Sequence, residues 1–399
     1  MRELLSLDEA VRTVLEHARP LPAERVPLEE AAGRVLAEPA RAAVDLPPFA
    51  SSAMDGYALR AADAPGTLPV VARIAAGSPA PRPLEPGEAM AIATGGAVPA
   101  GADAVAPIED VVASDNTIEL ARAVEGGAHV RPRGGDVRAG DVVVGAGQRL
   151  GPAQLGALAA AGVPEVACAR RPRATVLATG SELRPPGEPL APGEIYEANG
   201  LLLAAALGDA GAQVERLPVA VDEDGVHREA LEQALAADVV VTSGGVSVGP
   251  HDLVRRIEAE LGVEEIFWGV AVKPGKPVSF GVRGATLVFG LPGNPVSTLA
   301  GAELFVRPAL LALQGARDPG PAFLPGRLER PLRQDRLRDQ LVRARTRTAG
   351  EDVLLEPLGG QESHMIVRAA AAAALVLVPR GDGELAAGAT VRYLSIGRA

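Results

Sequence analysis

The chain has 399 residues, of which 47% are hydrophobic and only 3% aromatic, and its formal net charge is −11. This length suits about two to four domains, with cores filled mainly by Ala, Val and Leu. The negative charge argues against nonspecific binding to nucleic acid or to an anionic membrane, because both require a positive surface. The single cysteine, Cys168, excludes an internal disulfide and a thiolate metal cage.

The first 20 residues predict a helix rather than a targeting segment. Ser6 and Glu9 have the spacing of a capping box, and the helical pattern ends near Pro20. Charged residues occur throughout, so the basic-then-apolar order of a secretory signal is missing. The longest apolar run, Ala369 to Val378, is shorter than the roughly 20 residues that cross a bilayer. We therefore expect a cytoplasmic protein.

The next segments predict a β-rich unit inserted into a helical one. Residues 27–42, PLEEAAGRVLAEPARA, suggest a second helix that Pro47 and Pro48 interrupt. Short alternating segments with Gly and Pro follow, and a helix is expected again after Pro152. This pattern predicts two units: a helical linker domain of residues 1–43 plus 137–168, and a β-rich inserted domain of residues 44–136.

From Arg173 onward, strands and helices alternate regularly. The predicted strands are residues 174–178, 213–219 and 238–242, and the helices between and after them are residues 198–211, 225–236 and 252–261. This alternation predicts a doubly wound α/β domain with a largely parallel sheet over residues 169–316. After Ala316 the pattern returns to β, which predicts a small C-terminal barrel or sandwich of residues 317–399.

Three Gly- or Pro-rich loops in this α/β domain suit an anionic ligand. They are residues 238–252 (DVVVTSGGVSVGPHD), 273–277 (KPGKP) and 290–297 (GLPGNPVS). Backbone N–H groups and helix N-termini in such loops favour negative charge, and ligands of α/β sheets bind at the carboxyl ends of strands. The alternative is a strand-to-helix turn without a ligand. The candidate binding residues of the first loop are Ser243, Gly244, Gly245 and Ser247.

Three carboxylates at predicted strand ends could hold a divalent cation. Glu182, Asp222 and Asp252 supply the hard oxygen ligands that a Mg²⁺ ion beside phosphate requires. The alternative is that each acid caps a helix or lies in a solvated loop, and Asp252 in particular could cap its own helix. The five histidines lack metal-ligand spacing, and neither a Ser-His-Asp order nor an H-E-x-x-H motif is present.

Two lysines and two prolines shape the other loops. Lys273 and Lys276 flank a Pro-Gly turn and could bind phosphate or a tetrahedral oxyanion, although surface lysines of a hairpin are the alternative. Pro292 and Pro295 fix the backbone just before a helix N-terminus.

Arginines at period two mark a strand of the last domain. Arg343, Arg345 and Arg347 would share one strand face, either as a wall toward an anion or as a solvated face, which we favour for at least two of them. In the β-rich insert, Asp55 and Thr94 lie beside glycines and could polarise an oxyanion or orient water. Turn chemistry explains this pair equally well.

Nine motifs in order resemble those of the molybdopterin molybdenumtransferases, the MoeA family, which is related to the E domain of gephyrin. The motifs cover nearly the whole chain: PPFASSAMDGYA, ATGGAVPAGADAV, RPRGGDVRAGD, TGSEL, IYEANG, TSGGVSVGPHD, VKPGKP, GLPGNPVS and the β-rich C-terminal segment. The resemblance implies an elongated four-domain chain with a β-rich insert, a central α/β molybdopterin-binding domain and a C-terminal β-barrel. It also implies a homodimer whose active site is completed by both subunits.

The activity implied by this resemblance is insertion of molybdate into adenylylated molybdopterin, with release of AMP and formation of molybdenum cofactor. The pterin supplies the dithiolene sulfurs, and the protein supplies positioning, a divalent ion such as Mg²⁺ and oxyanion stabilisation. A contact with the molybdopterin adenylyltransferase is also implied. A non-catalytic scaffold and molybdopterin adenylylation are the competing functions.

The resemblance also assigns roles to individual residues. It places Glu182, Asp222 and Asp252 beside the nucleotide phosphates and the metal. Polar site residues of the insert, reaching the partner subunit, would be Asp55, Thr94 and Asp136. The groups around the oxyanion or pterin phosphate would be Lys273, Lys276, Arg343 and Ser363. The chain departs from the family pattern at Gly269, where a basic residue often follows the Phe-Trp pair, and around Ser363, which rests on a loose match.

Overall fold

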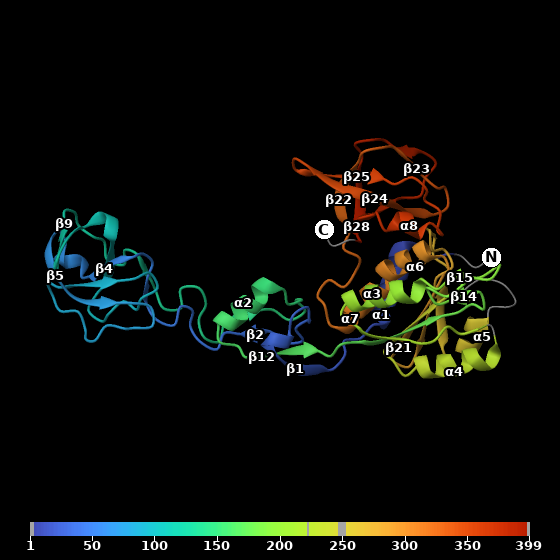
Figure 1. Ribbon diagram of the computed structural model, residues 1–399, viewed down its shortest axis with the longest axis horizontal. Coiled ribbons are helices and arrows are strands. Elements are labelled where there is room, and N and C mark those ends of the chain that lie inside the picture. Colours follow the sequence, from blue (N-terminus) through green and yellow to red (C-terminus); the bar gives the residue numbers. More distant parts are fainter. Residues whose placement is uncertain (1–3, 222, 246–252, 397–399) are drawn as a thin grey trace.

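The computed structural model describes residues 4–221, 223–245 and 253–396. The molecule is elongated, with a β-rich unit at one end, a thin connecting unit in the middle, and an α/β unit carrying a β-rich C-terminal unit at the other end (Figure 1). This architecture confirms the predicted fold class. The domain boundaries at residues 43, 136, 168 and 316 stay a prediction.

The first helix, α1 (Leu7–His17), begins with the predicted capping box. The Ser6 hydroxyl accepts a hydrogen bond from the Glu9 N–H, and the Glu9 carboxylate accepts one from the Ser6 N–H. The buried face of α1 packs into the main core of the α/β unit, most of whose other residues come more than 150 positions later in the chain.

The connecting unit is built from short strands rather than from a second N-terminal helix. Residues 27–42 form one 3₁₀ turn, η1 (Leu28–Glu30), and strand β2. The helix prediction was wrong because Pro39 removes a backbone donor inside the segment and Gly33 has a φ of +72°, which ends a helix. The remaining elements are β1 (Ala23–Pro27) paired with β12 (Glu165–Ala169), β2 (Ala40–Arg41) paired with β11 (Val142–Val144), and helix α2 (Pro152–Ala160).

The distant β-rich unit contains a six-stranded sheet of order β7-β4-β6-β5-β9-β8. A Cβ atom at Gly56 would lie 2.0 Å from the Ala106 carbonyl oxygen, so only glycine allows β4 and β7 to pair here. Its elements are β4 (Gly56–Leu59), η2 (Ala61–Asp63), β5 (Gly66–Ile74), β6 (Ala89–Ile92), β7 (Ala104–Pro107), η3 (Ile108–Asp110), β8 (Val112–Ser114) and β9 (Thr117–Leu120), with β3 (Ser51–Ser52) paired to β10 (Val130–Arg131).

The α/β unit has a six-stranded sheet of order β16-β13-β17-β21-β20-β18. The first four strands pair in parallel, whereas β20 pairs antiparallel with both β21 and β18. This confirms the predicted largely parallel sheet. The strands are β13 (Arg173–Ala178), β16 (Gln213–Arg216), β17 (Val239–Ser243), β18 (Glu264–Trp268), β20 (Ser279–Arg283) and β21 (Thr286–Leu291).

Helices cover both faces of this sheet (Figure 1). Buried residues of α3 (Asn199–Asp209) join those of α1 in one core, and those of α4 (Asp224–Ala234) and α5 (Leu253–Glu260) form a second core on the other face. The helices α6 (Pro295–Gly301), η4 (Ala302–Val306, a π-helical segment) and α7 (Arg307–Leu313) make one continuous helical stretch.

That stretch, Pro295–Leu313, is the one helix among the described residues that is long and apolar enough to cross a membrane. In its most apolar window, 78% of the residues are buried inside the protein, which is the pattern of a core helix. The longest apolar run of the sequence, Ala369–Val378, which is too short to cross a membrane, ends in β26 (Ala374–Val378) in the core of the C-terminal unit.

The C-terminal unit is a closed barrel. Its strands pair in the ring β24-β25-β22-β28-β26 and back to β24. A short strand of the α/β unit, β19 (Val272–Lys273), pairs with β24 as well. The other elements are β22 (Leu324–Leu328), β23 (Leu332–Arg333), β24 (Asp339–Ala349), β25 (Asp352–Pro357), α8 (Ile366–Ala369), β27 (Glu384–Leu385) and β28 (Thr390–Ser395).

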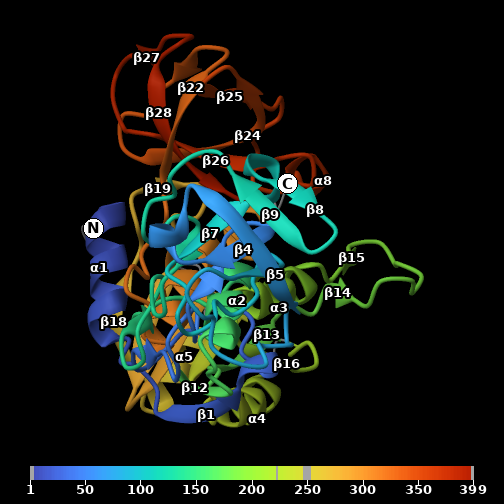
Figure 2. The ribbon, with the colours of Figure 1, turned by 90° about the vertical axis from the view of Figure 1, so that its left-hand side faces the viewer.

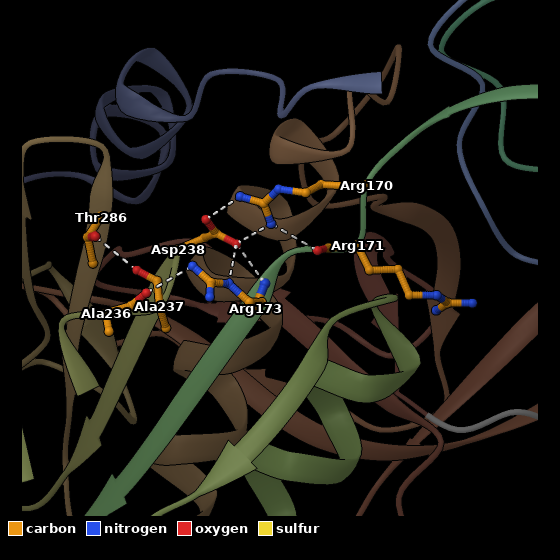
Figure 3. Close-up of polar contacts among 7 residues, drawn as sticks. All are labelled: Arg170, Arg171, Arg173, Ala236, Ala237, Asp238 and Thr286. Carbon is orange, nitrogen blue, oxygen red and sulfur yellow. Dashed lines mark hydrogen bonds and ion pairs between the residues drawn. The ribbon is translucent and has the colours of Figure 1, made fainter. Parts of the chain in front are cut away.

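The joint between the connecting unit and the α/β sheet is held by one carboxylate (Figure 3). Asp238 accepts two hydrogen bonds from the Arg170 guanidinium, both 2.7 Å, and one of 2.8 Å from the Arg173 backbone N–H. Burial raises the pKa of Asp238, but the hydrogen bonds from Arg170 and Arg173 outweigh it, so the pKa lies below its ordinary value. The ionised carboxylate therefore stabilises the fold.

Asp238→Asn is expected to lower the free energy of unfolding by about 2 kcal/mol at neutral pH, because it leaves the Arg170 charge without a counter-ion. This contribution is present above about pH 4 and disappears as the pH falls through the lowered pKa. Urea unfolding at several pH values would measure it. Asp352→Asn is the control, since its pair with Arg327 is about half exposed on both sides and should contribute less than about 1 kcal/mol. Equal effects of the two substitutions would contradict the assignment.

Candidate functional site

A cleft of about 670 Å³ lies at the carboxyl edge of the parallel sheet. Three strand ends and the N-terminal part of α3 border it, as expected for ligand sites of open α/β sheets. Its walls come from four segments of the α/β unit and from one loop of the barrel: residues 178–183, 195–199, 243–245 and 293–295, and His364 with Ile366. Five predicted site residues line it: Glu182, Ser243, Gly244, Gly245 and Pro295.

The glycines of the first loop are required by close backbone approach. Gly244 has a φ of +98°, and a Cβ atom there would lie 2.6 Å from the Thr179 carbonyl oxygen. Gly245 has a φ of +63°, and its Cβ atom would lie 2.5 Å from a methyl carbon of Val254. Backbone N–H groups without neighbouring side chains form the kind of surface that approaches a phosphate closely.

Asn199 joins this loop to the second one. Its side-chain amide donates 2.8 Å to the Ser243 hydroxyl and 2.7 Å to the Gly293 carbonyl oxygen. The two loops are therefore fastened together from the first residue of α3. Pro292 lies behind the cleft wall, buried, and its carbonyl oxygen accepts a hydrogen bond of 2.6 Å from the Thr298 hydroxyl.

The barrel contributes its wall through the loop that precedes α8. The Ser363 carbonyl oxygen accepts a hydrogen bond of 3.1 Å from the Val296 N–H, in the first turn of α6. This bond docks the barrel loop on the 290–297 loop and places His364 and Ile366 along the cleft. Ser363 itself is half-buried next to the cleft rather than among its lining residues.

Arg343 supports this loop from inside the barrel. Its side chain is 1% exposed, and its guanidinium donates to the carbonyl oxygens of Met365 (2.7 Å), Gly360 (2.8 Å) and Glu362 (3.1 Å). Burial lowers the pKa of Arg343 from its ordinary value. The structure thus gives Arg343 a positioning role instead of the predicted contact with substrate. Arg345 and Arg347 are exposed, which confirms the solvated-face alternative for them.

Arg343→Met is expected to destabilise the barrel by about 2 kcal/mol, because three loop carbonyl groups lose their donor. Hydrogen exchange of residues 359–366 should accelerate, and urea unfolding should report the loss of stability. Arg345→Met is the matched control, since this arginine lies two residues along the same strand and its side chain is 60% exposed. A loop that exchanges at the same rate in both variants would contradict the positioning role.

The two predicted lysines lie outside the cleft lining. Lys273 and Lys276 are both exposed, and the Lys273 ammonium lies 4.0 Å from the carboxylate of Asp335 in the barrel. Both lie where the α/β unit meets the barrel, as shown by the pairing of β19, which includes Lys273, with β24.

Asp55, Thr94 and Asp136 are far from the cleft of their own chain. They belong to the β-rich unit and its connection, at the opposite end of the molecule (Figure 1). Asp55 and Thr94 do lie together, since the Asp55 carboxylate accepts a hydrogen bond of 2.7 Å from the Thr94 N–H, and both residues are exposed. Asp136 is exposed as well, and its N–H donates to the Leu46 carbonyl oxygen.

The predicted metal site is only partly within the described residues. Asp222, Asp252 and the predicted binding residue Ser247 lie outside them. In the described part of the chain, no three His, Cys, Asp or Glu residues are grouped closely enough to hold an ion. Glu182 is exposed at the cleft beside the glycine loop, and its carboxylate would be 2.6 Å from a Cβ atom at Gly180. A carboxylate there fits one ligand position of Mg²⁺.

Comparison with known proteins decides the family. Residues 5–162 match the MoeA N-terminal region (domain I and II), residues 175–312 match a probable molybdopterin binding domain, and residues 325–396 match the MoeA C-terminal region (domain IV). The chain belongs to the MoeA family. The resemblance drawn from the nine motifs is thereby confirmed.

Proteins similar to this chain match it over nearly its whole length. Molybdopterin molybdenumtransferase 2 of Mycobacterium tuberculosis is 38% identical over 398 residues, covering 96% of this chain and 97% of that protein. The molybdopterin molybdenumtransferase of Staphylococcus epidermidis is 31% identical, covering 97% and 94%. A crystal structure of the molybdopterin biosynthesis MoeA protein of Pyrococcus horikoshii superposes with a TM-score of 0.81 at 32% identity, covering 100% of both chains.

The MoeA motifs did not single out two cleft residues, Asn199 and His364. Asn199 belongs to the IYEANG motif. Its position at the start of a helix after a short strand could have indicated a cleft residue. His364 comes from the barrel, and only the docking of the loop on α6 brings it to the cleft. No local pattern in the sequence indicates that contact.

Proposed function

We propose that this protein is a molybdopterin molybdenumtransferase that inserts molybdate into adenylylated molybdopterin, releases AMP and forms molybdenum cofactor. One observation supports this most strongly: two glycine-containing loops, the Asn199 amide and the Glu182 carboxylate converge on one cleft at the carboxyl edge of the sheet. Such a cleft can hold a phosphorylated ligand through backbone N–H groups and leave a carboxylate beside it.

The substrate brings its own ligands for molybdenum in this proposal. The two dithiolene sulfurs belong to the pterin, and the single cysteine of the protein, Cys168, is buried in the connecting unit. Burial also raises the pKa of the Cys168 thiol, which disfavours the thiolate that binds metals. The protein contributes binding, orientation and charge.

Glu182 would hold a divalent cation, such as Mg²⁺, together with Asp222 and Asp252. A bound Mg²⁺ would neutralise charge on the phosphate oxygens of the nucleotide. Lys273, Lys276 and Ser363 would face the oxyanion or the pterin phosphate, where the α/β unit meets the barrel. Arg343 would act on the same region by holding the loop that carries Ser363.

The site would be completed in a homodimer in the cytoplasm. The β-rich unit, to which Asp55 and Thr94 belong and which Asp136 follows in the chain, lies at the opposite end of the molecule from the α/β unit that forms the cleft (Figure 1). In a two-fold dimer, the β-rich unit of one subunit can approach the cleft of the other. A contact with the molybdopterin adenylyltransferase would deliver the adenylylated substrate directly.

The test is a single-turnover assay with purified protein, adenylylated molybdopterin, molybdate and MgCl₂. We expect AMP and molybdenum cofactor to form together, and both to depend on added molybdate and Mg²⁺. Binding of the substrate without AMP release would contradict the transferase proposal and favour a scaffold. Formation of adenylylated product from ATP and molybdopterin would instead indicate an adenylyltransferase.

A further inference from the structure

Tyr196 lines the cleft from a projection at its rim. The projection consists of β14 (Leu183–Arg184), β15 (Ile195–Tyr196) and the residues between them, and it extends away from the body of the α/β unit (Figure 2). The side chain of Tyr196 is 46% exposed. Among the described residues that line the cleft, it carries the one phenyl ring, in a chain with only 3% aromatic residues.

The ring is held in place by the projection itself. The Tyr196 hydroxyl donates a hydrogen bond of 2.9 Å to the Glu188 carbonyl oxygen. Tyr196 pairs in register with Arg184, whose guanidinium forms an ion pair of 2.5 Å with Glu194 and donates to the carbonyl oxygens of Ser181 and Leu183. A ring that is fixed before binding loses little conformational entropy when a ligand stacks on it.

We propose that Tyr196 is a specificity residue that stacks on the planar heteroaromatic ring of the ligand whose phosphate lies at the Gly244–Gly245 loop. Tyr196 and this loop border the same cleft, whose volume of about 670 Å³ is within the usual range for small-molecule sites. The polar loops select phosphate, and a half-exposed aromatic face in the same cleft selects a flat ring. This inference rests on the proposed function and refines it.

Two rings in the proposed reaction have this chemistry, the adenine of the nucleotide and the pterin. Both are flat, conjugated and linked to phosphate, so both suit a tyrosine face. The experiment separates them by using AMP and neopterin monophosphate as probes, with ribose 5-phosphate as a probe that has a phosphate and no ring. Isothermal titration calorimetry of the full chain would give the three dissociation constants.

Tyr196→Ala is expected to weaken binding of one ring-bearing probe by about 5- to 100-fold, the range that stacking on an aromatic side chain provides. Ribose 5-phosphate should bind as it does to the unaltered protein. Tyr196→Phe keeps the ring face and should retain most of the affinity, losing only the tether to Glu188. Leu190→Ala is the matched control, because Leu190 is 41% exposed on the same projection but does not line the cleft.

The outcomes separate this inference from the proposed function. Unchanged binding of both ring-bearing probes by Tyr196→Ala would overturn stacking, while AMP release in the turnover assay would leave the transferase proposal intact. An equal loss for ribose 5-phosphate, or a change in sedimentation that shows a disrupted dimer, would also overturn it. Failure of the unaltered protein to bind either ring would overturn both.

Discussion

Gly244→Ala is expected to reduce molybdenum insertion by about a hundredfold or more, because a displacement of about 1 Å in a binding loop costs that much. The added Cβ atom would lie 2.6 Å from the Thr179 carbonyl oxygen and 2.8 Å from the Thr179 hydroxyl. The backbone φ of +98° would be strained for alanine as well. The loop must therefore shift relative to Thr179, which lines the same cleft. AMP release and AMP affinity should both fall.

Gly293→Ala is the matched control for this experiment. Gly293 lines the same cleft and is exposed, but its Cβ atom would have no closer neighbour than the Gly244 Cα atom at 3.8 Å, which is ordinary contact. Its turnover should stay near that of the unaltered protein, and thermal unfolding should confirm that both variants fold. If Gly244→Ala turned over as fast as Gly293→Ala, the loop would not be the phosphate site.

Asp55→Asn and Glu182→Ala are each expected to lower turnover by about a hundredfold or more while the chain stays folded, because each removes one charge from the proposed site. Asp55 and Glu182 are exposed, so neither substitution disturbs a core. Mixing the two inactive variants should then restore activity. A heterodimer has one site in which Asp55 from one subunit and Glu182 from the other are both intact, and one site that lacks both. Since about half of randomly assembled dimers are heterodimers, coexpression should give about a quarter of the unaltered turnover.

The control for this rescue pairs two lesions of the β-rich unit. Coexpression of Asp55→Ala with Asp55→Asn leaves every shared site without the Asp55 carboxylate, so no rescue is expected. If the Asp55→Asn and Glu182→Ala mixture stayed inactive while size-exclusion chromatography showed mixed dimers, the site would not be shared between subunits.

The α/β unit was predictable because its signals are local. Apolar runs such as residues 239–241 lie in buried parallel strands, and glycines after these strands mark the turns at the ligand edge. The second N-terminal helix was wrong for an equally local reason, since residues 27–42 carry helix formers that Pro39 and Gly33 override. Their extended course is fixed by pairing of β2 with β11 and by a bridge between Leu36 and Cys168, about a hundred residues later.

The site was predictable where its residues end or closely follow strands of the sheet. Ser243 ends β17, Gly244 and Gly245 follow it directly, and the structure places all three at the cleft. Arg343 shows the limit of this reasoning. Its period-two neighbours are solvated, whereas its own guanidinium is enclosed by a loop 17 to 22 residues later in the chain. Whether a strand arginine faces a ligand, the solvent or a loop depends on tertiary packing that sequence spacing does not contain.

The pairing of β19 with β24 joins a segment of the α/β unit to a strand of the barrel. Val272 and Lys273 hydrogen-bond along the outer edge of the barrel wall, although they enter it from the neighbouring sheet domain. A swing of the barrel about the linker after Ala316 would therefore pull the KPGKP turn along with it. The position of the Lys273 ammonium group, 4.0 Å from the Asp335 carboxylate of the barrel, is thus set by both domains at once.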